Sequence, residues 1–134
     1  MKKITIEHIK NLKNSHTPFA TLTAYDYTSA QILDAAGIPL ILVGDSASMM
    51  IYGYETTLPV SLEEMMLIVK AVTRGVTSSL VVADMPFLSY QPSVEEAIKN
   101  AGLFLKKGGA SAVKLEGGRH IVKHIKSLVQ NGIP

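Results

Sequence analysis

The sequence predicts an α/β fold in which helices cover a parallel sheet. Four short apolar runs rich in β-branched residues recur along the chain, at 20–24, 40–43, 80–83 and 112–115. Segments with helical signals separate these runs, so strands and helices alternate as βα units. Continuously apolar strands are typical of parallel sheets that helices cover, either open and doubly wound or closed into a barrel. The pattern alone does not choose between the two.

Capping signals place the connecting helices. The first is expected over about 28–36, because the glycine and proline of 37–39 stop it in the usual order. The second and third begin with a serine followed three residues later by a glutamate, the spacing of a capping box, and end at a glycine, over 61–75 and 93–108. A fourth helix is expected over about 120–130, where apolar residues recur at helical spacing.

A repeated tripeptide bears on the extent of the fold. Gly-Ile-Pro at 37–39 leads from the first helix into the second strand, and the same tripeptide returns at 132–134. Its role is to end a helix with glycine and enter a strand through Ile-Pro, so the second copy predicts a fifth strand. We therefore expect a truncated chain that holds four βα units of a fold whose usual eight need about 250 residues.

Composition argues against several classes of protein. The 134 residues fall within the size of one domain, and 47% hydrophobic with 18% charged residues is an ordinary globular balance. The net charge of +2 comes without a long basic block, so a nucleic-acid partner is not expected. The absence of cysteine fits a reducing compartment, and we expect a cytoplasmic location. No signal peptide or bilayer-length apolar run is seen, so we expect a soluble protein without a membrane partner.

Polar residues follow each predicted strand, where a βα fold places its site. Asp26 follows the first strand, Asp45 the second, Asp84 the third, and Lys114 and Glu116 end the fourth. Two carboxylates about 4 Å apart repel by roughly 4 kcal/mol at an effective dielectric near 20. A cluster of Asp45, Asp84 and Glu116 therefore needs a cation or a proton. With oxygen ligands and no nearby histidine or cysteine, magnesium is the predicted cation.

Each of these residues also has a plainer structural explanation. An aspartate just after a strand often caps the next helix, which fits Asp26 best and stays open for Asp45 and Asp84. Lys114 and Glu116 lie two residues apart, so they point to the same face of their strand and could form a simple ion pair. Composition and spacing alone predict a βα protein with a candidate metal site of oxygen ligands, and nothing more specific.

Five segments, in order over essentially the whole chain, resemble the ketopantoate hydroxymethyltransferase family. They are Leu22-Thr23-Ala24-Tyr25-Asp26-Tyr27, Val43-Gly44-Asp45-Ser46, Thr57-Leu58-Pro59-Val60, Asp84-Met85-Pro86-Phe87 with Ser89-Tyr90, and Val113-Lys114-Leu115-Glu116-Gly117-Gly118. The resemblance implies a (β/α)8 TIM barrel of roughly twice this length that assembles as a homo-oligomer. Residues 1–134 would be the N-terminal half of a single barrel domain.

The resemblance also assigns roles to strand-end residues. Asp45, Asp84 and Glu116 match the family's magnesium site, and Asp45, Ser46, Asp84 and Lys114 match its substrate-binding positions. The implied reaction transfers a hydroxymethyl group from 5,10-methylenetetrahydrofolate to 3-methyl-2-oxobutanoate and gives 2-dehydropantoate, for pantothenate and coenzyme A biosynthesis. Magnesium would act as a Lewis acid on the 2-oxo acid, and Lys114 would add a fixed positive charge. The family's general base is a glutamate beyond residue 134, so no catalytic residue is expected here and the chain alone should be inactive.

Two departures and two alternatives accompany the resemblance. Ala47-Ser48-Met49 stand where the family has Leu-Gly-Met, so the added Cβ at Ser48 could restrict the loop, and Leu67-Ile68 replace a Tyr-His pair. One alternative is another magnesium-dependent enolate barrel, of the phosphoenolpyruvate mutase and isocitrate lyase kind, against which the segment 114–118 argues. The other is a non-catalytic fragment, or an assembly partner in a split barrel that receives its C-terminal half in trans.

Overall fold

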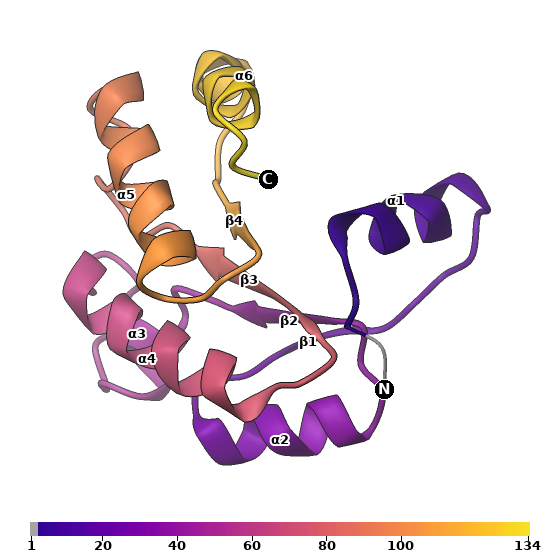
Figure 1. Cartoon of the computed structure of the whole chain (residues 1–134). Coiled ribbons are helices and arrows are strands. Elements are labelled where there is room, and N and C mark those ends of the chain that lie inside the picture. The colour runs from indigo at the N-terminus through magenta and orange to yellow at the C-terminus, as the bar shows by residue number, and fades with distance from the viewer. Residues whose placement is uncertain (1–2) are drawn as a thin grey trace.

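A four-stranded parallel sheet organises the fold, in a computed structural model that describes residues 3–134. The strands are β1 (Thr21–Thr23), β2 (Leu40–Val43), β3 (Leu80–Asp84) and β4 (Ala112–Lys114). The helices are α1 (Ile6–Asn14), α2 (Tyr27–Ala35), α3 (Ala47–Met50), α4 (Leu62–Gly75), α5 (Val94–Lys106), the 3₁₀ turn η1 (Arg119–Ile121) and α6 (Val122–Gln130) (Figure 1). All four predicted strands are confirmed.

The order of the strands distinguishes the two sheet types that the sequence left open. Each strand pairs in parallel with the next one along the chain, in the order β1-β2-β3-β4. A doubly wound sheet reverses its strand order at a switch point, whereas a barrel adds strands in one direction. The described strands never reverse, which is the order of a barrel wall. In the register, Val43 lies beside Ala83, and Asp84 lies beside Lys114.

Side-chain caps begin the helices where the sequence predicts. Ser61 forms a full capping box with Glu64, while the Ser93 hydroxyl accepts a hydrogen bond from the Glu96 amide at the start of α5. Asp26 is the N-cap of α2, because its carboxylate accepts hydrogen bonds from the amide and hydroxyl of Ser29. The capping explanation of Asp26 is thus confirmed. The fourth predicted helix begins as η1 and continues as α6.

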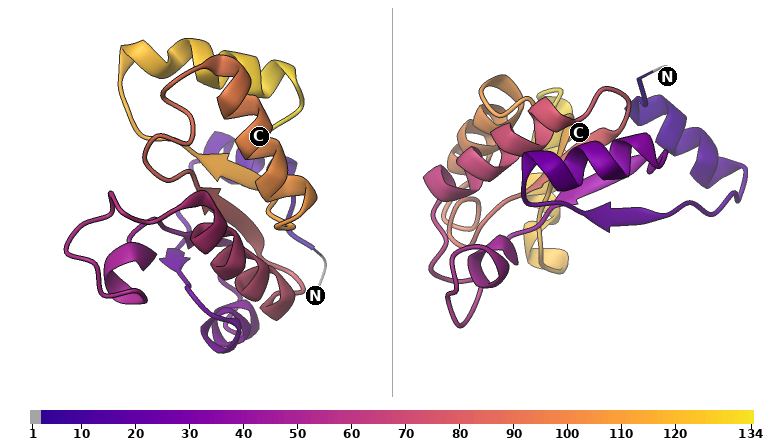
Figure 2. Two further views of the ribbon diagram at one scale, coloured as in Figure 1. Left: turned by 90° about the vertical axis from the view of Figure 1, so that its left-hand side faces the viewer. Right: turned by 90° about the horizontal axis from the view of Figure 1, so that it is seen from below.

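The hydrophobic core lies on one face of the sheet. Alternate strand residues are buried beneath the helices, namely Ile41, Val43, Val81 and Ala83, and they pack with Met65, Val69, Val72, Ala97, Ala101 and Phe104 of α4 and α5. Figure 2 shows these two helices lying over the strands. The intervening residues Leu40, Leu42 and Val82 point to the other face and are only half buried. The expectation of a sheet buried on both faces therefore holds for one face of the described chain.

A buried carboxylate, which no sequence pattern singles out, ties α2 to the start of β3. Asp34 accepts hydrogen bonds from the amides of Thr77, Ser78 and Ser79 and from the hydroxyls of Thr77 and Ser79, at 2.7–3.0 Å. Burial opposes its ionisation, but these hydrogen bonds outweigh the burial and hold the pKa of Asp34 well below its usual range. This clasp fixes the chain that enters β3.

The two Gly-Ile-Pro copies adopt the same conformation. Gly37 and Gly132 have φ angles of +79° and +75°, and the next isoleucine amide in each copy donates to a leucine carbonyl five residues earlier. These are the glycine-terminated helix ends that the repeat predicts. The carbonyls of Pro39 and Pro134 each accept a hydrogen bond from a sheet residue, Leu80 at 2.9 Å and Val113 at 3.0 Å. Pro134 thus lies beside β4.

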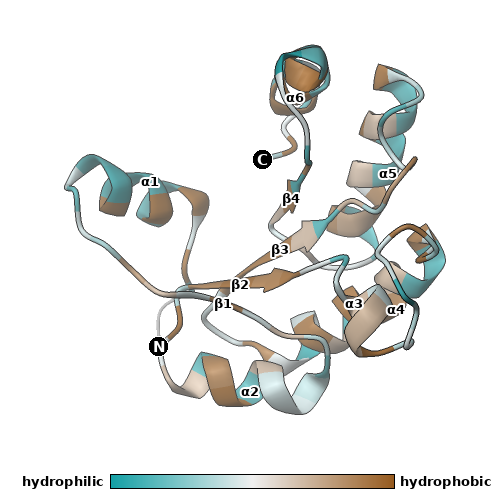
Figure 3. Ribbon diagram, turned by 180° about the vertical axis from the view of Figure 1, so that it is seen from behind, coloured by the Kyte–Doolittle hydropathy of each residue, from teal (hydrophilic) through white to brown (hydrophobic). Residues whose placement is uncertain are grey.

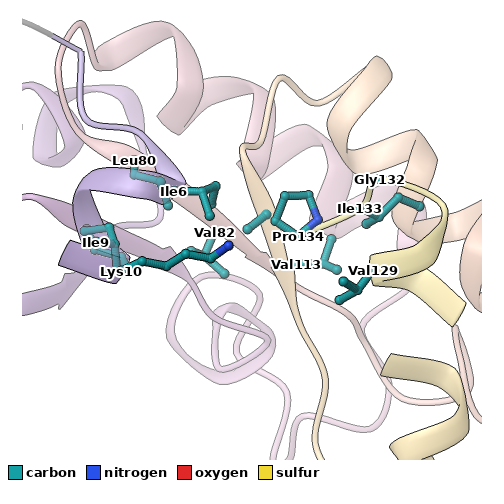
Figure 4. A pocket seen from close by; sticks show the side chains of 12 residues that line it. Ile6, Ile9, Lys10, Leu80, Val82, Val113, Val129, Gly132, Ile133 and Pro134 are labelled. Atoms are coloured by element: carbon teal, nitrogen blue, oxygen red, sulfur yellow. The ribbon is translucent and has the colours of Figure 1, made fainter. Parts of the chain in front are cut away.

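Two elements were not predicted, α1 and α3. Helix α1 has no buried residue, although Thr5 caps it by accepting from the His8 amide, and α3 spans four residues without a side-chain cap. Helix α1 lies on the far side of the strands from α4 and α5 (Figure 1). Its Ile6 and Ile9 line an open hollow of about 490 Å³ together with Leu40, Leu80, Val82, Ala112, Val113, Val129 and Ile133. Figure 4 shows α1 on one side of this hollow and Pro134 on the other.

The chain is expected to self-associate in solution. Within residues 3–134, β1 and β4 each have one neighbouring strand, Pro134 covers the outer edge of β4 only at Val113, and the hollow exposes apolar side chains of the sheet. Unpaired strand edges and apolar patches of this kind promote association. Val129→Lys places a charge in the hollow and should lower the mass measured by light scattering, whereas Val122→Lys, on α6 outside the hollow, should not. A wild-type chain that is monomeric at every concentration tested would contradict this expectation.

Every helix within the described chain is too short or too polar to cross a membrane. Helix α6 spans only nine residues, and Figure 3 shows that it carries both hydrophobic and hydrophilic residues. Its buried side carries Leu128, and its polar residues include Lys123 and Lys126.

Candidate functional site

The strand-end residues that the sequence singled out gather at the carboxyl edge of the sheet. Asp45 and Ser46 follow β2, Asp84 ends β3, Lys114 ends β4, and Glu116 lies two residues beyond. Because the three strands are parallel and adjacent, their ends meet at one edge. Asp84 lies two residues after Val82, so its side chain points to the same, open face of the sheet. Lys114 is the neighbour of Asp84 on β4, so its side chain points to that face as well.

The ammonium group of Lys114 joins two carboxylates. Its Nζ donates to Asp84 Oδ2 and to Glu116 Oε1, both at 2.8 Å. The ion pair between Lys114 and Glu116 that the sequence allowed is therefore present. The three side chains differ in exposure, at 3% for Asp84, 37% for Lys114 and 66% for Glu116. Lys114 thus bridges a buried carboxylate at the sheet and an exposed one at the surface.

Burial and the contacts between these groups shift the pKa of Asp84 and of Lys114. Burial is the main cause that raises the pKa of Asp84, and the nearby charge of Asp45 adds to it, although Lys114 and the Asp45 amide act in the opposite direction. Burial opposes the charge of Lys114, but hydrogen bonds to Asp84 and Glu116 outweigh it and raise the pKa of Lys114. The ionised form of Asp84 is therefore disfavoured by burial and favoured by the positive charge of Lys114.

Asp45 and Ser46 reach the site from the loop after β2. The Asp45 amide donates to Asp84 Oδ2 at 3.2 Å, so this loop is tied directly to the buried carboxylate. Ser46 Oγ lies 2.7 Å from the hydroxyl of Tyr25, which follows β1. Neither Asp45 nor Asp84 caps a helix, because the N-cap of α3 is Ser46 and no helix begins directly after β3. The capping explanation is therefore wrong for both aspartates.

The carboxylates do not form a preformed three-ligand metal cluster. Across residues 3–134, no three histidine, cysteine, aspartate or glutamate side chains lie close enough together to hold a metal ion. The physical reason is that Lys114 lies between Asp84 and Glu116 and satisfies both charges. The donors are nevertheless oxygen atoms that suit magnesium. The Glu116 side chain is 66% exposed, so packing does not hold it in its present rotamer.

The two departures from the resembled family have structural explanations. Ser48 is buried, and its hydroxyl donates to the Thr56 carbonyl at 2.7 Å, which closes the segment 48–56 that follows Asp45. Its φ angle is not positive, so the Cβ imposes none of the backbone strain that a glycine would avoid there. Ile68 is 6% exposed and packs in the core, whereas Leu67 is exposed.

Tyr90 is a residue at this site that sequence reasoning did not assign a role. Its hydroxyl donates to the Glu116 carbonyl at 2.9 Å and accepts from the Glu116 amide at 3.1 Å. Burial is the main cause that raises the pKa of Tyr90, so the hydroxyl keeps the proton that it donates. The sequence signal was present, because Ser89-Tyr90 formed part of the resembled motif.

Removing the charge of Lys114 should alter the ionisation of Asp84. Lys114→Met removes the hydrogen bond and charge that oppose the effect of burial, so the pKa of Asp84 is expected to rise further. Carboxyl-detected NMR titration of selectively labelled aspartate measures this change. Lys123→Met, on the exposed side of α6, serves as the control and should leave the titration of Asp84 unchanged. An unchanged pKa for Asp84 in Lys114→Met would mean that the ion pair does not persist in solution.

A family model and the curated relatives of this chain point to the same family. The family model described as ketopantoate hydroxymethyltransferase matches residues 3–134. The chain is 50% identical over 133 residues to the 3-methyl-2-oxobutanoate hydroxymethyltransferase of Syntrophus aciditrophicus, covering 99% of this chain and 49% of that protein. It is 52% identical over 134 residues to the enzyme of that name from Carboxydothermus hydrogenoformans, covering 100% and 49%. The chain thus spans about half the length of the curated relatives that it matches.

Solved structures agree on the fold. A 2,3-dimethylmalate lyase, described as a member of the phosphoenolpyruvate mutase and isocitrate lyase superfamily, aligns with a TM-score of 0.69 at 14% identity, over 95% of this chain and 49% of that chain. An oxaloacetate acetylhydrolase in complex with 3,3-difluorooxalacetate aligns with a TM-score of 0.70 at 11% identity, over 97% and 50%. At these identities the likeness supports the barrel-type fold alone.

Proposed function

The chain belongs to the ketopantoate hydroxymethyltransferase family, and from this we propose that it supplies the substrate and metal side of a 3-methyl-2-oxobutanoate hydroxymethyltransferase site. The whole reaction would move a hydroxymethyl group from 5,10-methylenetetrahydrofolate to the 2-oxo acid and form 2-dehydropantoate. The observation that carries the proposal is the contact of Lys114 with Asp84 and Glu116 at the carboxyl edge, tied to Asp45 through its amide.

The side chains at the site can stabilise the two negative charges of a small transition state. Lys114 presents a fixed ammonium at the mouth of the site, where it can stabilise negative charge that develops on the ketone oxygen. The Ser46 hydroxyl can donate to the substrate carboxylate when Tyr25 donates to Ser46 Oγ, because the two hydroxyls share one hydrogen bond. Asp84 stays ordered through Lys114 and the Asp45 amide.

Magnesium fits this donor chemistry in part. Asp45, Asp84 and Glu116 would hold it, and it would supply a Lewis acid for the oxygens of the 2-oxo acid. The raised pKa of Asp84 and the repulsion from Asp45 indicate a place where a cation is stabilised. Glu116 would join the ligands after its ion pair with Lys114 opens, and its exposure permits that movement.

The remaining parts of the activity lie outside these residues in our proposal. The chain would form the N-terminal half of a single barrel domain, and the second half would complete the wall and carry the general base. That half would belong to the same polypeptide or join in trans, and the complete barrel would form a homo-oligomer in the cytoplasm. The half-length match to the relatives also supports a second candidate, a non-catalytic piece that acts only after assembly.

The test combines the chain with the second half of the Carboxydothermus hydrogenoformans relative and assays 2-dehydropantoate formation. Activity should require magnesium and disappear with a chelator. Asp84→Ala should lose most of the turnover, whereas Asp26→Ala, which alters a strand-end aspartate with a capping role, should keep most of it. If Asp84→Ala and Asp26→Ala lose activity equally, the assignment of the site at Asp84 is wrong.

A further inference from the structure

Tyr90 lies where the hydrogen-bonded pairing between β3 and β4 ends. The last hydrogen bond between the two strands runs from the Met85 amide to the Lys114 carbonyl, at 3.0 Å. In a continuing parallel ladder, the Glu116 amide would next donate to the Met85 carbonyl, and the Phe87 amide would donate to the Glu116 carbonyl. Neither bond forms in the described chain, because the chain that follows β3 turns after Pro86.

The Tyr90 hydroxyl takes the place of both missing bonds. It accepts from the Glu116 amide and donates to the Glu116 carbonyl, so one side-chain atom satisfies both backbone groups of that residue. A hydroxyl can do this because it has one proton to donate and lone pairs to accept. Tyr90 is only 3% exposed, which holds its ring in one position.

The loop that carries Tyr90 is itself anchored. The Ser89 amide and hydroxyl both donate to the Pro86 carbonyl, at 3.0 and 2.7 Å, and close the turn after β3. The Asn100 side chain on α5 donates to the Ser89 carbonyl at 2.7 Å. Helix α5 is therefore linked to the backbone of Glu116 through the hydrogen bond to Ser89, the peptide bond to Tyr90 and the hydrogen bonds of the Tyr90 hydroxyl.

We propose that Tyr90 is a positioning residue that fixes the backbone of Glu116, so that its carboxylate stays within reach of Lys114 and of a magnesium ion beside Asp84. The role in metal binding rests on the function proposed above, whereas the hold on the Glu116 backbone does not. Tyr90 touches neither metal nor substrate in this arrangement. It acts through the residue that it holds.

The experiment measures hydrogen exchange at the Glu116 amide by mass spectrometry, on the chain alone without metal and on the chain assembled with the second half of the Carboxydothermus hydrogenoformans relative, with and without magnesium. Tyr90→Phe removes only the hydroxyl, and exchange at Glu116 should rise by about tenfold while β3 and α5 keep their protection. Tyr52→Phe is the matched control, because it removes a tyrosine hydroxyl that donates to the Glu64 carbonyl, and exchange at Glu116 should stay within about twofold of wild type. In the assembled protein magnesium should protect the wild-type amide, and Tyr90→Phe should raise the magnesium concentration needed by about tenfold, the usual cost of losing a residue that orients a ligand.

The outcomes separate the two claims. Unchanged exchange at Glu116 in Tyr90→Phe, or an equal rise across β3 and α5, would overturn the positioning role. Wild-type exchange that does not respond to magnesium would count against the proposed metal site, and the hold of Tyr90 on Glu116 would still be decided by the exchange without metal. Should Tyr90→Phe fail to fold, Asn100→Ala decides instead, because it releases the Tyr90 loop from α5 and should raise exchange at Glu116 in the same direction.

Discussion

The chain alone is expected to form 2-dehydropantoate roughly 10²–10⁴-fold more slowly than the same chain assembled with the second half of a relative, because positioned proton transfer contributes about that factor. The family's general base is expected in the second half. The described chain also offers one wall of the site, with Lys114 and Glu116 partly or largely open to solvent. Magnesium and 3-methyl-2-oxobutanoate should therefore bind weakly or not at all to the chain alone.

The assay compares equal concentrations of the chain alone, the second half alone and the two co-expressed. Recovery of activity on co-expression is the expected result and would show assembly in trans. Light scattering of the same samples reports whether the self-association of the chain gives way to a defined complex. Turnover by the chain alone at the level of the assembled protein would contradict our account, because all the catalytic groups would then lie within 134 residues.

Asp34→Ala should lower the free energy of unfolding by about 3–4 kcal/mol, because it leaves more than one buried donor without an acceptor. The amides of Ser78 and Ser79 lose their partner, and each buried unsatisfied donor costs about 1–3 kcal/mol. Asp26→Ala is the control, since loss of an exposed N-cap typically costs about 1 kcal/mol. Urea unfolding at low protein concentration measures both. Equal losses in the two variants would mean that the Asp34 clasp adds no more than a helix cap.

The same residue predicts how stability depends on pH. The pKa of Asp34 is lower in the folded chain than its usual value, so its carboxylate stabilises the fold fully above the unfolded pKa of about 4. That contribution is lost as the pH falls below this value and through the folded pKa. Asp34→Asn should remove this part of the acid dependence. A wild-type stability that stays flat below a pH of about 4 would contradict the assignment.

Local patterns in the sequence were sufficient for the sheet and most helices. Apolar β-branched runs located the four strands to within one or two residues, and Ser61 and Ser93 marked two helix starts. The Gly-Ile-Pro repeat predicted two helix ends of the same geometry, at Gly37 and Gly132. These features depend on neighbouring residues along the chain. The closure into a barrel was not predictable from spacing alone and entered through the family resemblance.

The features that spacing did not reveal depend on contacts between distant residues. Asp34 meets Thr77, Ser78 and Ser79 more than forty positions away, and no local pattern marks an aspartate inside a helix as their acceptor. The position of Lys114 between Asp84 and Glu116 depends on strand register, so the sequence predicted the group but not that the ammonium separates the carboxylates. Helix α1 was missed because it buries none of its own residues.

The central claim is that Asp45, Asp84 and Glu116 hold a divalent cation beside Lys114 at the carboxyl edge of the sheet. The most direct measurement is anomalous diffraction from crystals of the chain assembled with the second half of the Carboxydothermus hydrogenoformans relative, grown with manganese and 3-methyl-2-oxobutanoate. Our account predicts one strong manganese peak bonded to carboxylate oxygens of Asp45, Asp84 and Glu116, with Glu116 turned away from Lys114. A peak elsewhere, or a substrate-bound site in which Lys114 still bridges Asp84 and Glu116 without metal, would contradict it.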